Sequence, residues 1–260
     1  MTAQTKLHAG YSRYFTPPPT ELIAPTTVQQ FAGTTGAPNS TGSSPVRPEK
    51  DNYYDVGIIQ EIQKGFNLGI DAYYKQARDL LDLGQFGQAL IFSPFNYQKG
   101  RVEGVEFTAD YNQGPFSSYA NLAISRALGT NVESGQFNFT PDDLNYISNH
   151  WIHLDHDQRY TASAGAAYKL YDVTYSTDII YGSGLRRGFV NTGHLPDYGQ
   201  INLGIAHTFN LGSVGPLDAK ISVINLLDNV YEIRDGSGIG VFAPQFATGR
   251  SFYLALSKPF

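Results

Sequence analysis

The sequence predicts an all-β protein, an antiparallel transmembrane β-barrel of about ten strands. Many segments alternate large apolar residues with polar or small ones, which is the period of a strand whose two faces meet different surroundings. Short and long connections also alternate along the chain, as they do in barrels with tight turns on one side of a membrane and long loops on the other. The 18 Tyr, 16 Phe and 27 Gly agree with this class, because aromatic side chains gather at both membrane interfaces.

Composition excludes several other classes of protein. No stretch of the 260 residues approaches the roughly 18 consecutive apolar residues of a membrane-spanning helix. Cysteine is absent, so disulfides and thiolate metal sites are impossible. The net charge of −5, without a basic cluster in the sequence, argues against a nucleic-acid partner. We expect no cofactor and no resident metal.

The alternation defines ten segments. In one of them Leu68 and Ile70 alternate with Asn67 and Asp71, which places apolar and polar side chains on opposite faces. The last segment carries Phe252, Leu254 and Leu256 on one face and mostly small residues on the other. The segments predicted as strands are residues 6–15, 52–63, 66–78, 101–112, 116–128, 158–169, 172–184, 199–210, 217–228 and 249–260.

The connections between these segments fall into two groups. The short ones contain Gly, Pro or other turn residues, and the long ones include a Pro-, Thr-, Gly- and Ser-rich stretch at 16–51 that we expect to be a flexible surface loop. A soluble sandwich has no reason to sort its loops by length onto two ends. The short connections are 64–65, 113–115, 170–171 and 211–216, and the long ones are 16–51, 79–100, 129–157, 185–198 and 229–248.

Four motifs follow one another along the chain. They are PEKDNYYDVG at residues 48–57, RVEGVEF at 101–107, DHDQRY at 155–160, and a closing signature near the carboxy-terminus. In this order they resemble the strand motifs of TonB-dependent outer-membrane receptors, so the chain resembles the carboxy-terminal β-barrel portion of that family. The closing, or barrel-closing, motif consists of Asn225, Leu226, Asp228, Tyr231, Gly249, Arg250 and Phe260.

The residue types in the closing motif also predict structural roles for its members. The side-chain oxygens of Asn225 and Asp228 can bond to nearby backbone groups and set a turn. Gly249 relieves crowding at a strand start or permits a bulge. The resemblance implies that the strand ending in Phe260 is recognised by the barrel assembly machinery. These residues are expected to build the barrel rather than to bind a ligand.

The resemblance implies a larger protein. Members of the family carry a signal peptide, a TonB box and a plug domain inside a barrel of about 22 strands. None of these three parts is visible in residues 1–260, and ten strands cannot enclose a plug. We therefore expect an incomplete part of a 22-stranded barrel, an open and strongly curved sheet in which segments 6–15 and 249–260 do not pair.

The resemblance also implies a location and partners. The location is the outer membrane of a Gram-negative bacterium, where the chain meets lipid and lipopolysaccharide. The function is part of a receptor and transporter for a scarce small-molecule chelate such as a ferric siderophore. TonB would act only through a plug domain that these residues do not contain.

The spacing of three histidines suggests a candidate metal site. His150, His153 and His156 lie at three-residue spacing beside Asp155 and Asp157, and on a helix this spacing would place them on one face. The segment leads from a long loop into a strand, however, so we favour ordinary loop histidines over a zinc or iron site.

Other polar and aromatic residues are candidates for ligand contact. Arg186 and Arg187 could meet an anionic chelate, although ordinary charged loop residues are the favoured interpretation. Loop aromatic residues could stack on a ligand, but packing between loops is favoured. The loop aromatics are Trp151, Phe242 and Phe246, and the polar residues expected to face the wet lumen are Asp71, Lys75, Glu106, Asp110 and Asp178.

No catalytic pattern is present in the sequence, so we expect no enzyme. Two alternatives remain open at this point. One is a self-contained ten-stranded outer-membrane barrel that acts as a pore or surface enzyme, and the other is a secreted carbohydrate-binding β-sandwich. Pairing of 6–15 with 249–260 would favour the self-contained barrel.

Overall fold

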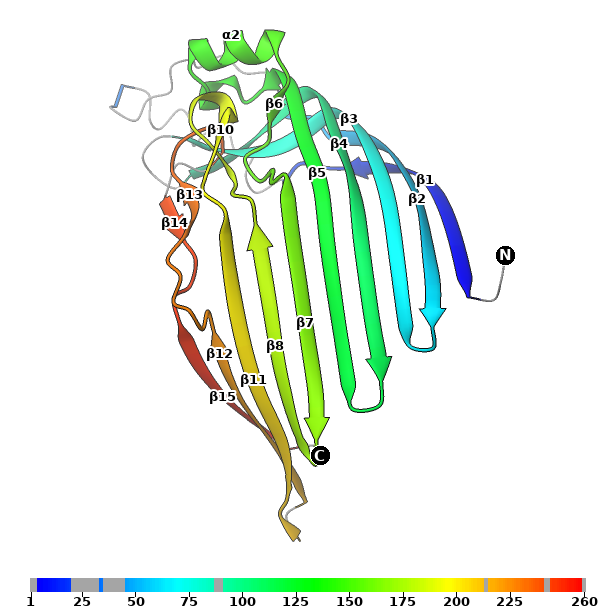
Figure 1. The fold of residues 1–260 in the computed structure, drawn as a ribbon. Coiled ribbons are helices and arrows are strands. Elements are labelled where there is room, and N and C mark those ends of the chain that lie inside the picture. Colours follow the sequence, from blue (N-terminus) through cyan, green and yellow to red (C-terminus); the bar gives the residue numbers. More distant parts are fainter. Residues whose placement is uncertain are drawn as a thin grey trace.

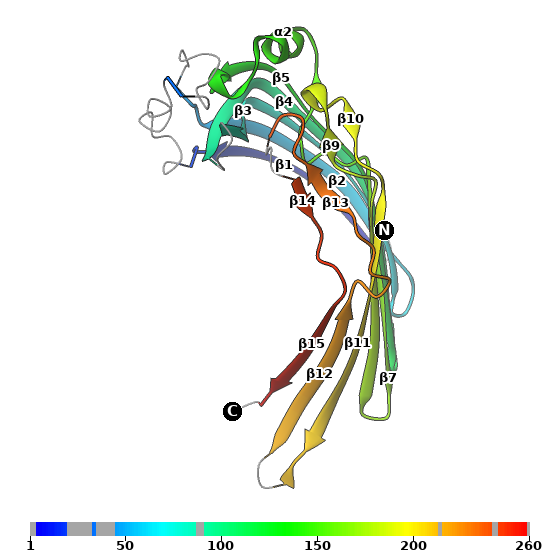
Figure 2. The same cartoon turned by 90° about the vertical axis from the view of Figure 1, so that its left-hand side faces the viewer.

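The computed structural model describes residues 4–19, 33–34, 45–86, 91–212, 215–240 and 244–258. The chain forms a strongly curved antiparallel sheet with its short turns at one end (Figure 1). Longer connections gather at the other end, where they include helix α2 (Pro141–Asn149). Seen edge-on, the sheet is concave, and β13 (Glu232–Asp235) and β14 (Pro244–Phe246) lie over its concave side (Figure 2). Most of the Pro-rich loop predicted to be flexible lies outside the described residues.

Each of the ten predicted segments contains a strand of the main sheet, and these strands pair in chain order. The sheet is a single layer, so the sandwich alternative is wrong (Figure 2). Its first and last strands lie at opposite edges and do not pair within the described residues, which confirms the open sheet and disfavours the self-contained barrel. The strands are β1 (Thr5–Thr16), β2 (Glu49–Gln63), β3 (Phe66–Phe86), β4 (Ile91–Gln113), β5 (Phe116–Ser134), β7 (Tyr160–Leu170), β8 (Val173–Gly182), β11 (Tyr198–Asn210), β12 (Pro216–Ile224) and β15 (Ser251–Ser257).

The register separates an apolar face from a polar one. Directly paired residues point to the same side of a sheet, so Ile58, Ile70 and Phe107 form one row. The adjacent row, Asp71 and Glu106, points to the other side. Large apolar side chains of the first face are exposed, as a lipid-facing surface requires. We assign the polar face to the concave side, because the loops that bury its upper rows lie there (Figure 2).

The short turns occur where glycine and turn residues predict them. Strand pairing closes on Gln63–Phe66 and Gln113–Phe116, which leaves two-residue turns. Gly65 and Gly114 occupy these turns with positive φ angles of 79° and 60°, a conformation that glycine adopts without steric cost. The turn predicted at 170–171 lies one residue further on, at Tyr171–Asp172.

The long connection predicted at 79–100 is wrong. β3 and β4 remain paired up to Phe86 and Ile91, so only residues 87–90 join them. The upper hairpin bends over the end of the sheet, and consecutive residues 93–97 of β4 are buried there, so both faces of that part of the strand meet protein (Figure 1). Where both faces of a strand are buried in protein, its sequence need not alternate apolar and polar residues. β5 likewise runs beyond the predicted residue 128, whereas β12 ends before the predicted residue 228.

The remaining long connections contain short elements that form a cap above the sheet. α2 begins at a capping box in which Thr140 Oγ1 accepts a hydrogen bond from Asp143 N, and Asp143 Oδ2 accepts one from Thr140 N. The Thr-Pro-Asp-Asp sequence is a typical signal for a helix start, although no helix was predicted in this connection. The other elements of the cap are η2 (Gln136–Asn138), β6 (Ile152–His153), β9 (Arg186–Arg187), η3 (Phe189–Asn191) and β10 (Gly193–His194). The cap also includes the upper ends of β3 and β4, which share its buried core, and the segment around β13, which ion pairs attach to it.

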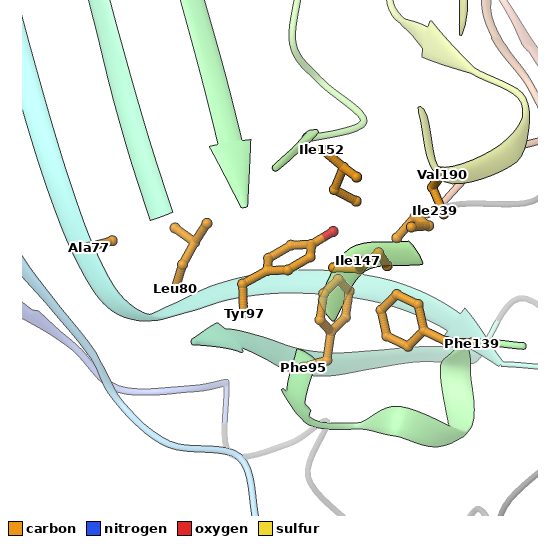
Figure 3. Close-up of a cluster of buried hydrophobic side chains, with 9 residues drawn as sticks. All are labelled: Ala77, Leu80, Phe95, Tyr97, Phe139, Ile147, Ile152, Val190 and Ile239. Carbon is orange, nitrogen blue, oxygen red and sulfur yellow. The ribbon is translucent and has the colours of Figure 1, made fainter. Parts of the chain in front are cut away.

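The buried apolar core lies in this cap and not within the spanning part of the sheet (Figure 3). Phe95 is its centre, with ring centroids 4.8 Å from Phe139 and 5.0 Å from Tyr97 in edge-to-face geometry. None of the helices among the described residues is long and apolar enough to cross a membrane. The core consists of Ala77, Leu80, Phe95, Tyr97, Phe139, Ile147, Ile152, Val190 and Ile239.

Candidate functional site

The cap contains a nearly buried carboxylate, Asp157, at its centre. Its Oδ2 accepts hydrogen bonds from Arg186 Nη2 at 2.9 Å and Nε at 3.2 Å, and lies 2.5 Å from His153 Nδ1. Its Oδ1 accepts a hydrogen bond from Ala127 N at 2.9 Å. Burial raises the pKa of Asp157, but the contacts with His153, Ala127 N and Arg186 outweigh it and hold the pKa below its usual range. The ionised form therefore ties β5, β6 and β9 together.

Two further ion pairs join the remaining loops of the cap. Arg234 Nη2 lies 3.0 Å from Asp155 Oδ2, and Arg187 Nε lies 2.9 Å from Asp235 Oδ2. Partial burial raises the pKa of Asp235, but hydrogen bonds from Ser237 and the charge of Arg187 outweigh it and lower that pKa. The segment around β13 is thus held on both sides by opposite charges.

Asp82 belongs to the same cap, beyond the apolar band of β3 that ends near Tyr74. Burial and the negative charge of Asp155 raise the pKa of Asp82 to about 7, against the opposing effects of the Leu83 N–H and Arg234. The cap therefore holds carboxyl groups whose pKa values are displaced in opposite directions.

The three histidines do not share one helix face. His150 follows the last residue of α2 and stacks on Tyr146, with ring centroids 4.1 Å apart. His153 lies in β6 against Asp157, and His156 lies in a turn with its Nδ1 against Asp155 Oδ1. The helical spacing on which the metal hypothesis depended is therefore wrong. Among the described residues, no three metal-ligating side chains come together.

The candidate ligand contacts are mostly occupied by other protein groups. Arg186 and Arg187 are both paired with carboxylates, as described above. Trp151 is half-exposed, and the Arg101 guanidinium lies 5.2 Å from its ring centroid. Phe246 is exposed on β14, and Phe242 lies outside the described residues.

The concave face carries polar side chains, including those predicted to face the lumen. His8 Nε2 lies 2.6 Å from Asp71 Oδ1, and Asp71 lies directly across from Glu106. Nearer the short turns, Tyr119 donates a hydrogen bond from its hydroxyl to Asp178 Oδ1 at 3.1 Å. The same region forms an open groove of about 460 Å³, which Asp110, Tyr119 and Asp178 help to line.

A second polar cluster lies on this face near the cap. Lys75 Nζ lies 2.5 Å from Glu49 Oε1 and 3.0 Å from Asp51 Oδ2, and both carboxylates are nearly buried. Glu49 Oε2 also accepts a hydrogen bond from Leu81 N at 2.7 Å. Lys75 is among the residues predicted to face the lumen, whereas Glu49 and Asp51 are not. Their alternation within the PEKDN motif is the sequence signal that could have identified them.

In the closing motif, Asn225 organises the turn after β12. This residue is fully buried with a positive φ of 53°. Its Oδ1 accepts a hydrogen bond from Asn229 N at 3.0 Å. Its Nδ2 donates to the carbonyl oxygens of Asn229 at 2.9 Å and Thr248 at 3.1 Å. Nearby, Leu226 N donates a hydrogen bond to the carbonyl oxygen of Ile201 at 2.7 Å.

The other residues of the closing motif surround this turn. Asp228 Oδ1 accepts a hydrogen bond from Arg250 N at 2.8 Å. Tyr231 stacks on Tyr198 at 4.3 Å, with an interplanar angle of 4°. A Cβ atom at Gly249 would lie at an ordinary 3.4 Å from Asp228 Oδ1, so these contacts do not support the predicted relief of crowding. Phe260 lies outside the described residues.

Comparisons with known proteins agree with this architecture. A family model described as "TonB dependent receptor-like, beta-barrel" matches residues 1–226. No curated protein matches the chain.

Several solved structures that share the fold are much longer than this chain. The ferric citrate transporter FecA in its unliganded form has a TM-score of 0.65 at 17% identity, over 98% of this chain and 36% of that one. The siderophore receptor PiuA from Acinetobacter baumannii has a TM-score of 0.64 at 16% identity, over 98% and 34%. The copper transporter OprC has a TM-score of 0.63 at 16% identity, over 97% and 37%. The chain thus spans about a third of the length of these structures.

Proposed function

Because this chain belongs to the TonB-dependent receptor β-barrel family, we propose that it forms one wall of a transporter that imports a scarce chelate such as a ferric siderophore. The family lies in the outer membrane of Gram-negative bacteria, and its members are transporters rather than enzymes. The names of the structurally similar proteins, which include transporters for ferric citrate and for copper, support a metal or metal-chelate ligand.

The observation that carries the proposal is the open, curved sheet with an apolar convex face and a polar concave one. In lipid, an unpaired strand edge leaves backbone N–H and C=O groups without partners, and each such group costs several kcal/mol. Both β1 and β15 present such edges among the described residues. We propose that residues 1–260 are the carboxy-terminal part of a larger barrel and that further strands pair with these edges.

Within that barrel, the concave face would border a plug domain through which TonB supplies energy. The cap would contribute to the extracellular entrance, because it lies at the end where the long connections gather. The closing motif would hold the last hairpin in register, and the strand ending in Phe260 would be recognised by the barrel assembly machinery.

Uptake measurements test this function. The complete gene is expressed in a Gram-negative strain that lacks its own iron receptors. Uptake of radioactive iron is then followed for ferric citrate, a ferric hydroxamate and a ferric catecholate. We expect uptake of at least one chelate, and its loss when TonB is deleted. Uptake that persists without TonB would instead indicate an ungated pore, and no uptake of any chelate would contradict the siderophore assignment.

A further inference from the structure

Three cationic residues stand side by side on the sheet, above its apolar band. Lys50 on β2 pairs directly with Arg78 on β3, and Arg78 pairs with Lys99 on β4. All three are exposed. Tyr54 on β2 and Phe107 on β4 lie on the convex, lipid-facing side of the sheet. Lys50 and Lys99 are separated from them by even numbers of residues, so their side chains lie on the same side, as does that of Arg78, which pairs with both.

A second row of the same face adds two more cations. One step nearer the apolar band, the paired residues run from Arg13 through Asn52 and Gln76 to Arg101. We call Lys50, Arg78, Lys99, Arg13 and Arg101 the basic strip. The sequence shows no basic cluster because these residues are scattered over four strands, and only the register brings them together.

The main row of the basic strip has no counter-charge within the described part of the protein. Lys50, Arg78 and Lys99 take part in none of its ion pairs. The acid of this face that lies nearest along β4, Glu103, is paired with Arg126 and with Arg101 of the second row. Like charges directly opposite each other across strands are destabilising, so this row favours an external anion.

The position of the basic strip identifies the kind of anion. Tyr11, Tyr54 and Tyr74 form a paired row at the upper border of the apolar band, where the aromatic girdle of a barrel meets the membrane interface. The two rows of the strip lie two and four residues beyond Tyr54 along β2, or about 7 and 13 Å at 3.3 Å per residue. Strand tilt reduces this height, so the cations lie at the depth of the outer-leaflet headgroups.

We propose that the basic strip binds the phosphate groups of lipid A, the membrane anchor of lipopolysaccharide in the outer leaflet. Neighbouring strands lie about 4.8 Å apart, so the Lys50–Arg78–Lys99 row presents three donors within reach of one phosphate group. Arg13 lies one row nearer the apolar band, where it meets a second phosphate, whereas Arg101 in the same row is already in contact with Glu103 and Trp151. The acyl chains lie below, against the apolar face around Val56 and Val105. This binding does not depend on which ligand the protein transports.

The test compares two triple variants of the complete protein, purified in a non-ionic detergent. The first is Lys50→Gln/Arg78→Gln/Lys99→Gln. The matched control, Lys6→Gln/Lys64→Gln/Lys169→Gln, removes the same charge from exposed positions toward the short-turn end. Binding of diphosphoryl lipid A is measured with the wild type and both variants, and heat-modifiable gel migration verifies that each variant is folded.

We expect at least about tenfold weaker binding to the first variant and unchanged binding to the control. For the wild type, binding should weaken from diphosphoryl to monophosphoryl to phosphate-free lipid A, and it should weaken as salt screens the charges. Equal binding of both triple variants, or equal binding of phosphate-free lipid A, would overturn the proposal. If the first variant does not fold, Lys99→Gln alone should weaken binding several-fold, and wild-type affinity in that variant would overturn the proposal as well.

Discussion

Arg186 donates two hydrogen bonds to a single oxygen of Asp157, and the two side chains are only 12% and 2% exposed. The pair joins β9 to the loop that leads into β7. A backbone hydrogen bond of 3.2 Å from Arg186 N to the carbonyl oxygen of Asp155 joins the same two segments, and the buried ion pair reinforces it.

Asp157→Asn should therefore open the cap. Breaking a buried ion pair from one side leaves an uncompensated charge and costs about 3–5 kcal/mol. We expect faster amide hydrogen exchange in residues 183–195 of the complete protein. Arg47→Gln is the control, because that arginine is 55% exposed in its ion pairs and such pairs contribute about 1 kcal/mol or less. Equal exchange in both variants would contradict a central role for Asp157.

The stability of the cap should depend on pH in two phases. The pKa of Asp82 is raised to about 7, so the folded cap retains a proton that the open cap releases, and stability falls as pH rises from about 4 to 7. The pKa values of Asp157 and Asp235 are lowered, so their contribution is present above about pH 4 and is lost as pH falls further.

Hydrogen exchange of the cap, corrected for the intrinsic pH dependence of amide exchange, measures this profile. Protection should be greatest in mildly acidic solution, near pH 4 to 5. Asp82→Asn should remove the decrease in protection between pH 4 and 7, but protection should still be lost below about pH 4. A flat profile in the wild type would show that these carboxyl groups do not control the cap.

The two ends of the sheet should be accessible from opposite sides of the membrane. Cysteines placed at Asn145 in α2 and at Ser237 in the cap should react with an impermeant maleimide on intact cells. Cysteines at Lys64 and Gln113, at the short-turn end, should react only after the cells are opened. Equal labelling of all four positions on intact cells would disprove this orientation.

A charge on the convex face should be costly, and a charge on the concave face should not. Ile205 is half-exposed and lies in the apolar row between Tyr175 and Ile221, so Ile205→Arg should cost about 2–4 kcal/mol. Ser222 pairs with Gly204 on the other face, and Ser222→Arg should cost much less. Urea unfolding of the complete protein in lipid vesicles measures both effects, and similar values would mean that the faces are assigned wrongly.

The turn after β12 should depend on the Asn225 side chain. Asn225→Ala removes three hydrogen bonds and places alanine at a positive φ, which should cost about 2–4 kcal/mol. Asn229→Ala is the control, because that side chain donates a single exposed hydrogen bond to Gly199. The same unfolding measurement should show a loss of less than about 1 kcal/mol for the control.

Local patterns predicted the strands because they depend on neighbouring residues alone. The alternation from Asn67 to Tyr74 reports two faces with different surroundings, whichever strands lie beside it. Gly65 and Gly114 marked turns because their backbone conformation is local. The same reasoning was wrong for 79–100, where consecutive residues 93–97 of β4 are buried on both faces and the alternation is lost.

The cap and its charges could not be predicted in this way. His150, His153 and His156 have the spacing of a helix face, but α2 ends before His150, and packing in the cap places each of them differently. The pairing of Asp157 with Arg186 joins separate loops, and no sequence pattern encodes which loops meet.

The sequence by itself determined an antiparallel sheet of ten strands, its apolar and polar faces, and the gathering of short turns at one end. These follow from side-chain period and turn chemistry, which are local properties. Only the tertiary structure decided how residues far apart along the chain combine. Lys50, Arg78 and Lys99 form one row because strand register aligns them, and register is a relation between strands that no single segment contains.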